Sequence, residues 1–321
     1  IFESGWAALG FTRVNLIEAA PVARAYGAAV VTAVGGVRQS TATVHLQRAL
    51  ASASSRLELR TDAEVQRLLL KDGVAQGVTI RYKDGATEAA WLRTNGSVVL
   101  AAGALSTPRL LAASGIGQPS QLLDLASAGL LAPEPVCPHC DAIDTPAGWR
   151  ENSGVGARIT DKVITKLTFN SPAPVDQPQE TFAPKEWASH QAEFAAYVAN
   201  RTGPYAQFGP LSVAYLQSPN ATEADVQVWI GYATDRADGG NGSNFEVFLS
   251  LIAPVSHASL DIKPDPVKPG VISTSPSRWF YMFGANGDGE SDREVMTWAL
   301  NLTIEAIMQA QPEARLLKNW G

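Results

Sequence analysis

The sequence predicts a mixed fold of the α/β or α+β class, in which the strands form two separate groups. The first group lies between Leu57 and Gly103, where short apolar segments are divided at Asp72-Gly73 and Asp84-Gly85. Asp-Gly is a strong hairpin signal. The second group lies between residues 162 and 253, where apolar and polar residues alternate. This alternation is typical of an antiparallel sheet with one solvated or ligand-facing side.

The stretch SVVLAAGALSTPRLLAASGIG, residues 97–117, predicts a strand, a turn and a short helix. Val98–Leu100 form an apolar, partly β-branched run that suits a strand covered on both faces. Thr107 can cap a helix through its hydroxyl, and Pro108 suits the first helical position because it has no N–H. Gly115 suits a left-handed stop. We therefore expect the helix to begin at Pro108 and to end just before Gly115.

Four small residues, Ala101–Ala104, leave the backbone almost bare between this strand and this helix. Small residues before a helix N-terminus let a ligand approach the main chain, and the free N–H groups there favour an anion such as a pyrophosphate. Tight packing of a strand against a helix also demands small residues. The residues alone leave both interpretations of this turn open.

Three further helical regions follow from periodicity and capping residues. Residues 1–26 predict one or two helices, and Ser40–Ser54 predict a helix that packs on one side through residues such as Leu50. The closing helix is expected to begin at an N-cap Ser291, with Glu294 completing a capping box.

The second group of strands follows a Pro-rich, irregular stretch between Gly117 and Gly154, which we expect to be the crossing between two domains. The strands expected after it span residues 162–169, 211–218, 225–233 and 245–253.

Composition and charge argue against some classes of partner. The chain has 321 residues, of which 45% are hydrophobic and 17% charged, enough for a sizeable core and two domains. A net charge of −6 without any run of Lys or Arg argues against nucleic acid or an anionic membrane as a partner. No apolar run approaches the roughly 18–20 residues of a membrane span. The first residues show neither an initiator Met nor a signal-peptide pattern, so we expect a processed or truncated product.

Five Asn-X-Ser/Thr sequons indicate a glycoprotein on the secretory route, and hence an extracellular location. Most of them lie in or beside polar or turn-rich stretches, where a glycan can be accommodated. Asn301 is the least favourable, because it falls inside a predicted helix. The expected glycosylation sites are Asn95, Asn200, Asn220, Asn241 and Asn301.

The two cysteines, Cys137 and Cys140, form the motif CPHC. This spacing fits a short disulfide, a redox pair or half of a zinc site. A structural zinc ion needs four ligands, and the sequence offers no second Cys pair or nearby His cluster to complete the set. We prefer a loop disulfide and assign no metal site.

The segment GALSTPRLLAASGIG, Gly103–Gly117, resembles the second signature of the glucose-methanol-choline (GMC) flavin oxidoreductases. The likeness runs through the small residues, Ser-Thr-Pro, the paired leucines and Ser-Gly-Ile-Gly. The spacing around GGVRQSTATVHLQ and SGIG looks closest to the flavodehydrogenase part of cellobiose dehydrogenases. Four other segments resemble the family in the family's order: VRQSTATVHLQRAL, LRTDAEVQRLLLKDGVAQGV, NRTGPYAQFGPLS and APVSHASLDIKPDPVKPGVI.

The resemblance implies an FAD cofactor and a two-part architecture. Residues 1–130 would form a partial FAD-binding domain without the N-terminal Gly-x-Gly-x-x-Gly unit, and residues 131–321 a substrate-type domain with an antiparallel sheet and a closing helix. The family's central valine, matched here by Val65, offers backbone atoms to the flavin adenine. The expected cofactor-binding residues are Val65, Ala102, Gly103, Ala104 and Thr107.

The resemblance also implies a reaction on a small-molecule alcohol or sugar. The family passes hydride from a CH–OH group to flavin N5 while a His removes the hydroxyl proton. We assign no catalytic residue, because none of the four histidines has the family's flanking sequence. The family's N-terminal glycine motif and its C-terminal catalytic segment do not occur in this sequence. We expect them to lie outside the given sequence, to have been cleaved off or lost, or to be supplied by a second polypeptide. The four histidines are His45, His139, His190 and His257.

Four residues depart from the family pattern. Arg158 and Lys162 replace the usual Asn and His of one loop, and His257 and Ala258 stand where Arg and Gly are usual. These departures favour an alternative function, in which the chain is a catalytically inactive GMC-derived glycoprotein with a binding or structural role.

Overall fold

The computed structural model describes residues 2–17, 23–52, 56–131, 150–171, 191–206, 212–235, 243–276 and 289–320. The chain forms two compact units. Unit 1 comprises Ile1–Leu57, Lys162–Val255 and Asp288–Gly321, and unit 2 comprises Glu58–Asp161 and Ser256–Gly287. A single cut after residue 130 does not reproduce this division, because the chain passes between the units more than once. The assignment of residues 1–130 to the cofactor and 131–321 to the substrate stays a prediction.

Unit 1 is built on a seven-stranded sheet in the order β1-β2-β11-β12-β13-β10-β16. The pair β1 and β2 is parallel, and the other neighbours are antiparallel. The strands predicted between residues 162 and 253 are therefore confirmed, although β2 and β16 join them from distant parts of the sequence. The bounds are β1 Thr12–Arg13, β2 Ala25–Ala28, β10 Val163–Ser171, β11 Ser212–Leu216, β12 Val226–Asp235, β13 Ser243–Leu251 and β16 Arg315–Trp320.

The alternation of apolar residues fixes which face of this sheet is buried. In β10 the side chains of every second residue from Val163 to Ser171 are buried, and those between them are exposed or half-buried. Leu167 pairs in register with Val247, which pairs with Ile230, so one row of the buried face runs across three strands. The rings of Phe169 and Phe245 stack on it with centroids 5.3 Å apart. Burial on one face specifies the register, because a slip of one residue would expose the whole row.

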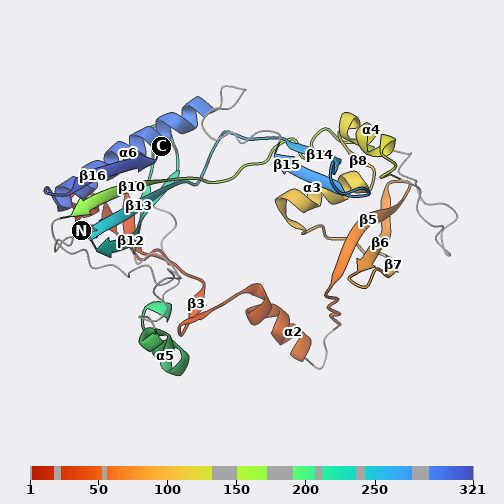
Figure 1. The fold of residues 1–321 in the computed structure, drawn as a ribbon, viewed down its shortest axis with the longest axis horizontal. Coiled ribbons are helices and arrows are strands. Elements are labelled where there is room, and N and C mark those ends of the chain that lie inside the picture. Colours follow the sequence, from red (N-terminus) through yellow and green to blue (C-terminus); the bar gives the residue numbers. More distant parts are fainter. Residues whose placement is uncertain are drawn as a thin grey trace. The chain divides into compact units, whose positions relative to one another are not determined.

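Two helices, α1 (Phe2–Ala8) and α6 (Gly289–Ala310), pack together in unit 1, and α6 lies along the sheet (Figure 1). Gly5 of α1 allows a close approach, since a Cβ there would lie 2.2 Å from the carbonyl oxygen of Ala306 in α6. The fully buried Trp6 contacts the rings of Phe2 and Phe11, at centroid distances of 5.9 and 4.8 Å.

The predicted start of the closing helix at Ser291 is wrong, because α6 already begins at Gly289. Ser291 and Glu294 therefore lie inside the helix rather than forming a capping box. A side chain of the first turn makes a tertiary contact. The buried carboxylate of Asp292 accepts a hydrogen bond of 3.0 Å from the backbone N–H of Val255.

Two other helix predictions are only partly right. Helix forms at α1, but the rest of the segment up to residue 26 contributes β1 and β2, because Ala25–Ala28 pair with β11. A helix does form at residues 42–51, as a π-helical turn, Ala42–Leu46, followed by α2, Gln47–Ala51. The predicted packing of this helix is wrong among the described residues, since neither part has a buried residue and Leu50 is 41% exposed.

The other elements of unit 1 are short. Strands β3 (Ala33–Val34) and β4 (Val37–Arg38) form a small hairpin, α5 spans Gln191–Asn200, and a 3-10 turn spans Pro204–Ala206.

Unit 2 begins with an antiparallel sheet of β5 (Ala63–Lys71), β6 (Val74–Tyr82) and β7 (Thr87–Trp91). Both predicted Asp-Gly turns are present. Asp72 and Gly73 have φ values of 50° and 78°, the left-handed pair that a two-residue hairpin requires. At the second turn, Asp84 accepts a hydrogen bond of 2.9 Å from the backbone N–H of Ala86.

Helices α3 (Gly103–Ala113) and α4 (Pro119–Ser127) pack with a second hairpin, β14 (Leu260–Pro264) and β15 (Ile272–Pro276). The two-residue strands β8 (Ile116–Gly117) and β9 (Arg150–Glu151) pair in parallel, and β8 contacts both α3 and α4. The buried core of this unit includes Ala112, Leu122, Leu125, Leu260 and Ile262. This core anchors the C-terminal half of α3, and the helix also packs against β5, where the backbone N–H of Leu68 donates a hydrogen bond of 2.9 Å to the hydroxyl of Ser114.

The predicted strand at Val98–Leu100 is wrong in the described structure. These residues are assigned to no strand, and Val99 is 84% exposed. A strand covered on both faces needs neighbouring strands, and none of the described strands pairs with this segment.

We predict that Gly5→Ala lowers the free energy of unfolding by about 1–3 kcal/mol, because overpacking between close elements costs that amount. The added carbon would overlap the Ala306 carbonyl, which outweighs the better helix propensity of alanine. Denaturant unfolding measures the difference. Ala7→Val, which adds carbon at an exposed position of the same helix, is the control, and an equal loss in both variants would contradict the prediction.

Candidate functional site: a basic cavity beside helix α3

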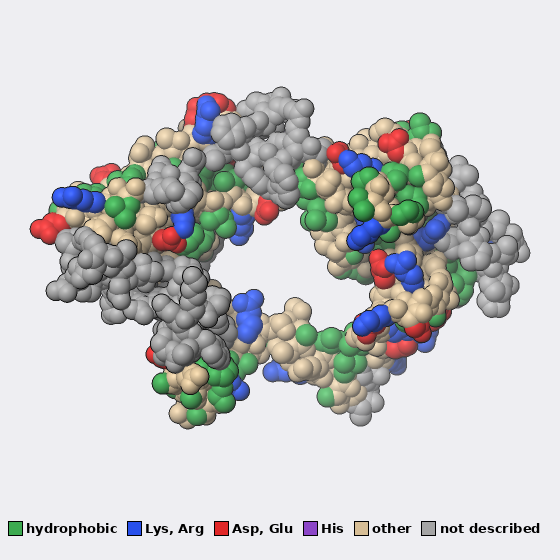
Figure 2. Space-filling view, in the orientation of Figure 1, with side chains coloured by type: hydrophobic (Ala, Val, Ile, Leu, Met, Phe, Trp, Pro, Cys, Tyr) green, Lys and Arg blue, Asp and Glu red, His purple; other side chains and the backbone are tan. Residues whose placement is uncertain are grey.

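A cavity of about 460 Å³ lies in unit 2, between β5, one side of α3 and the hairpin β14–β15. It brings together residues that are far apart in the sequence. On the face of unit 2 that Figure 2 shows, Lys and Arg side chains lie interspersed with Asp and Glu. The cavity lining is Ala63, Glu64, Val65, Gln66, Arg67, Arg81, Ala102, Ser106, Arg109, Leu110, Ala113, Leu130, Gly270, Val271 and Ile272.

The first predicted cofactor residue, Val65, lines this cavity at an irregularity in β5. Val65 pairs with Ile80, whereas Arg67 pairs with Thr79, so Gln66 is an extra residue in the ladder. A bulge of this kind leaves the extra residue unpaired and is often found next to functional sites. Val65 and Gln66 therefore line the cavity at a point where the ladder of β5 is interrupted.

The other predicted cofactor residues lie at the start of α3. Ala102 lines the cavity, and Gly103 follows it with a φ of +90°, a conformation that only glycine adopts without strain. The hydroxyl of Thr107 accepts a hydrogen bond of 3.1 Å from the backbone N–H of Ala102. Ala104 is an exposed residue of the first helical turn. The structure therefore places Val65 and Ala102 in one cavity, with Gly103 and Thr107 shaping the turn.

The helix predicted to start at Pro108 in fact starts at Gly103, and Pro108 lies inside it. Thr107 is therefore not the N-cap of α3. It caps the turn instead, because its hydroxyl reaches back to Ala102. The predicted stop is confirmed, since Gly115 has a φ of 79° and follows directly on the end of the helix.

Charged side chains give one end of the cavity a positive character. Arg81 donates a hydrogen bond of 2.7 Å to one oxygen of Glu64, and the guanidinium of Arg109 lies 3.7 Å from the other oxygen. The hydrogen bond from Arg81 lowers the pKa of Glu64, so this carboxylate is charged at neutral pH. Three arginines, with Arg67 the third, against one carboxylate leave a formal charge of +2 on the lining.

Sequence reasoning missed these charged residues as members of the site. Their signal is weak, because Glu64, Arg67 and Arg81 are scattered charged residues in strands of mostly uncharged residues, and Arg109 is the one charged residue of α3. Only the hairpin and the packing of α3 on β5 bring them together.

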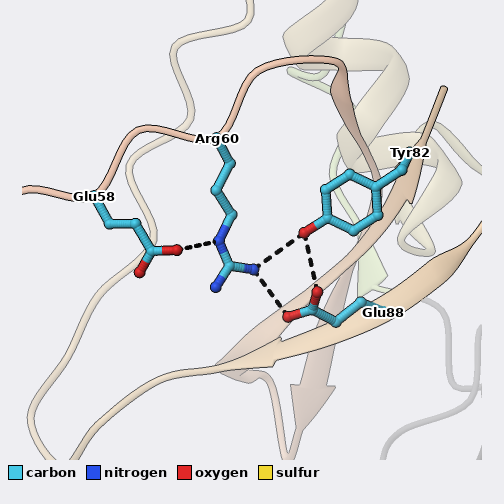
Figure 3. Close-up of polar contacts among 4 residues, drawn as sticks. All are labelled: Glu58, Arg60, Tyr82 and Glu88. Atoms are coloured by element: carbon cyan, nitrogen blue, oxygen red, sulfur yellow. Dashed lines mark hydrogen bonds and ion pairs between the residues drawn. The ribbon is translucent and has the colours of Figure 1, made fainter.

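A second polar cluster holds the segment before β5 against the sheet (Figure 3). Arg60 donates hydrogen bonds to Glu58 at 2.6 Å, to Glu88 at 2.8 Å and to the hydroxyl of Tyr82 at 3.2 Å. Tyr82 in turn donates to the second oxygen of Glu88 at 2.9 Å. The hydrogen bonds from Arg60 and Tyr82 lower the pKa of Glu88. The hydrogen bonds to Glu58 and Glu88 raise the pKa of Arg60. These exposed contacts orient the entry to β5.

The remaining predicted residues lie elsewhere. Asn95 is exposed in a turn with a φ of 62°, Asn220 is exposed in a turn, and Asn200 and Asn301 are exposed on α5 and α6. Outside the described residues lie Asn241, Cys137, Cys140, His139 and His190.

The described part of the chain contains no helix that is long and apolar enough to cross a bilayer. Within the same ranges, no group of three or more His, Cys, Asp or Glu is placed to hold a metal ion.

Comparison with known proteins identifies the class of protein that this fold and cavity define. The family model of the GMC oxidoreductases matches residues 1–164, about half of the chain. The chain belongs to the GMC oxidoreductase family. It is also 27% identical, over 255 residues, to an oxygen-dependent choline dehydrogenase from Rhizobium johnstonii, covering 74% of this chain and 39% of that relative.

Solved structures share the fold. A formate oxidase from Aspergillus oryzae matches with a TM-score of 0.63 at 15% identity, over 99% of this chain and 54% of that one. An FAD-dependent oxidoreductase from Chaetomium thermophilum matches with a TM-score of 0.66 at 16% identity, over 95% and 54%. A pyridoxine 4-oxidase from Mesorbium loti matches with a TM-score of 0.60 at 18% identity, over 95% and 50%. The chain thus spans about half of these structures and 39% of the curated relative.

These findings agree with the predicted family, the mixed fold class and the predicted cofactor, since FAD is named for two of the solved structures. A closer likeness to the cellobiose dehydrogenases stays a prediction.

We predict that Glu64→Gln lowers the free energy of unfolding at pH 7 by ~0.2–1 kcal/mol, the range for half-exposed ion pairs. Because Arg81 lowers the pKa of Glu64 in the folded state, the stabilisation is complete above the ordinary glutamate pKa of about 4.3 and is lost as pH falls through the lower folded value. Urea unfolding at pH 7 and at pH 3 measures the effect. Glu151→Gln, at an exposed position of the same unit, is the control; a difference as large at pH 3 as at pH 7 would contradict the ion-pair origin.

Proposed function

We propose that this chain contributes the adenosine-side half of the cofactor site to an FAD-dependent oxidoreductase that oxidises the CH–OH group of an alcohol. The observation that carries the proposal is the convergence of Val65, Ala102 and three arginines on one cavity. The family resemblance implied the first two residues as flavin contacts. The arginines supply the charge that a nucleotide cofactor requires.

The residues of the cavity fit the adenosine side of FAD. Leu110, Ala113, Leu130 and Ile272 offer apolar surface for a purine, and the bulge at Gln66 offers main-chain groups for its polar edge. The guanidinium groups at the other end suit phosphate oxygens, which arginine binds with fixed geometry. Both requirements are met within a single compact unit.

The chemistry divides between cofactor and protein. Bound flavin supplies the electron sink for the hydride that leaves the alcohol carbon. The described residues bind and orient the nucleotide end of the cofactor. We assign the removal of the hydroxyl proton to no residue of this chain, because His45 and His257 lie in segments without the family's flanking sequence.

The substrate we propose is a sugar or another small alcohol, of the kind that cellobiose dehydrogenases and their carbohydrate-oxidising relatives use. The support is the spacing around GGVRQSTATVHLQ and SGIG. The names of two similar proteins, a choline dehydrogenase and a pyridoxine 4-oxidase, also point to small hydroxyl compounds.

We propose further that the protein is secreted and glycosylated, with a disulfide between Cys137 and Cys140, and that a second polypeptide is among its partners. The sequons support the secretory route, and their asparagines at positions 95, 200, 220 and 301 are exposed.

A second candidate function is an inactive GMC-derived glycoprotein with a binding or structural role. Two segments that depart from the family pattern lie next to each other, because Ile159 and Ala258 exchange backbone hydrogen bonds of 2.7 and 2.9 Å. Arg158 and His257 flank this bridge. A change on both sides of one bridge favours the loss of an ancestral role at that place.

The experiment that separates the two candidates is an intact mass and a visible absorption spectrum of the protein isolated from its source, followed by alcohol-dependent reduction of an acceptor dye. Oxidised-flavin absorption together with dye reduction supports the oxidoreductase. A colourless protein that gains no flavin absorption on incubation with FAD contradicts it and favours the inactive glycoprotein.

We predict that Gly103→Val abolishes flavin retention. The native φ of +90° at this position is strained for valine, so the backbone should shift and displace the cavity wall at Ala102. Gly85→Val is a matched control. Gly85 has a φ of +88°, and as at Gly103 a Cβ there would meet nothing within 4 Å, so the backbone strain is similar. Flavin absorbance after gel filtration measures retention. Unchanged absorbance in Gly103→Val, or equal loss in both variants, would contradict the prediction.

A further inference from the structure

Arg109 lines the cavity with its hydrogen-bond donors unused. Its guanidinium lies 3.7 Å from Glu64, which is an ion pair but too long for a hydrogen bond. It donates no hydrogen bond to any described residue. Arg81, in contrast, is already committed to the same carboxylate at 2.7 Å.

The helix holds Arg109 in place over the cavity. Arg109 lies on α3 three residues after Ser106 and one before Leu110, and all three line the cavity. The C-terminal half of this helix is anchored in the core through Ala112. The side chain is 38% exposed, so a ligand can reach it without breaking a buried contact.

We infer that Arg109 binds the phosphate end of an adenosine nucleotide in this cavity, and that it makes the cavity select the phosphorylated nucleotide over the nucleoside. The inference rests on the proposed function, since it concerns the same cavity. Arginine presents a planar fork of donors that matches phosphate oxygens, and no donor of Arg109 is bonded to a described residue.

Glu64 limits how strong this selection can be. Its carboxylate stays charged at neutral pH and lies between Arg81 and Arg109, so it offsets part of their positive charge. We expect a moderate preference for the phosphorylated ligand, near the lower end of the range for charged hydrogen bonds.

The test is calorimetric titration of the purified chain with ADP and with adenosine. We expect ADP to bind about tenfold more tightly than adenosine, the factor for one weak charge-assisted contact. In Arg109→Gln the ratio should fall to near one while adenosine affinity stays unchanged. Arg109→Lys, which keeps the charge but loses the fork, should give an intermediate ratio and guards against a folding defect in the glutamine variant.

Arg93→Gln is the matched control, because it removes the same charge from an exposed position of unit 2 outside the cavity. It should leave the ratio unchanged. If adenosine and ADP both bind and Arg109→Gln keeps the wild-type ratio, the role of Arg109 is overturned and the proposed function stands. If neither ligand binds the wild-type chain, the proposed nucleotide cavity is overturned together with this inference.

Discussion

The positive φ of Gly103 is the constraint on which the candidate site depends. It marks the start of α3, directly after Ala102, which lines the cavity. Thr107 then holds the turn by accepting a hydrogen bond from the N–H of Ala102. The hydrophobic core holds the C-terminal half of the same helix, which carries Arg109. The turn at Gly103 and the packing of α3 thus place the bare turn and the cationic side chain beside one cavity.

The charged residues that line this cavity determine its electrostatic character. Strand residues Glu64 and Arg81 form a cross-strand ion pair, and Arg109 of α3 approaches the same carboxylate at a longer distance. The carboxylate therefore has two roles, since it ties the sheet to the helix and also neutralises part of the positive charge. The separate cluster around Arg60 orients the chain before β5 without contributing to the cavity. Apolar contacts set the shape of unit 2, and these charges set which ligands fit it.

Several elements could be predicted from local residues because local physics dominates them. The Asp72-Gly73 turn needs left-handed backbone at both positions, and the alternation in β10 needs one buried face, so both appear as expected. The errors occur where distant contacts decide. Val98–Leu100 have strand-forming side chains but no described partner strand, and the segment before Ala28 pairs with β11.

The sequence by itself determined the family, the two groups of strands, and the small residues at the turn before α3, because these are properties of residue type and spacing. It also pointed to Val65 and Ala102, through the family resemblance. Only the tertiary structure decided that these two residues share one cavity, that a bulge in β5 lies at its wall, and that Glu64, Arg81 and Arg109 meet there. The physical reason is that strand register and helix packing bring together residues such as Glu64 and Arg109, which are 45 positions apart in the sequence. No local sequence pattern encodes such a contact.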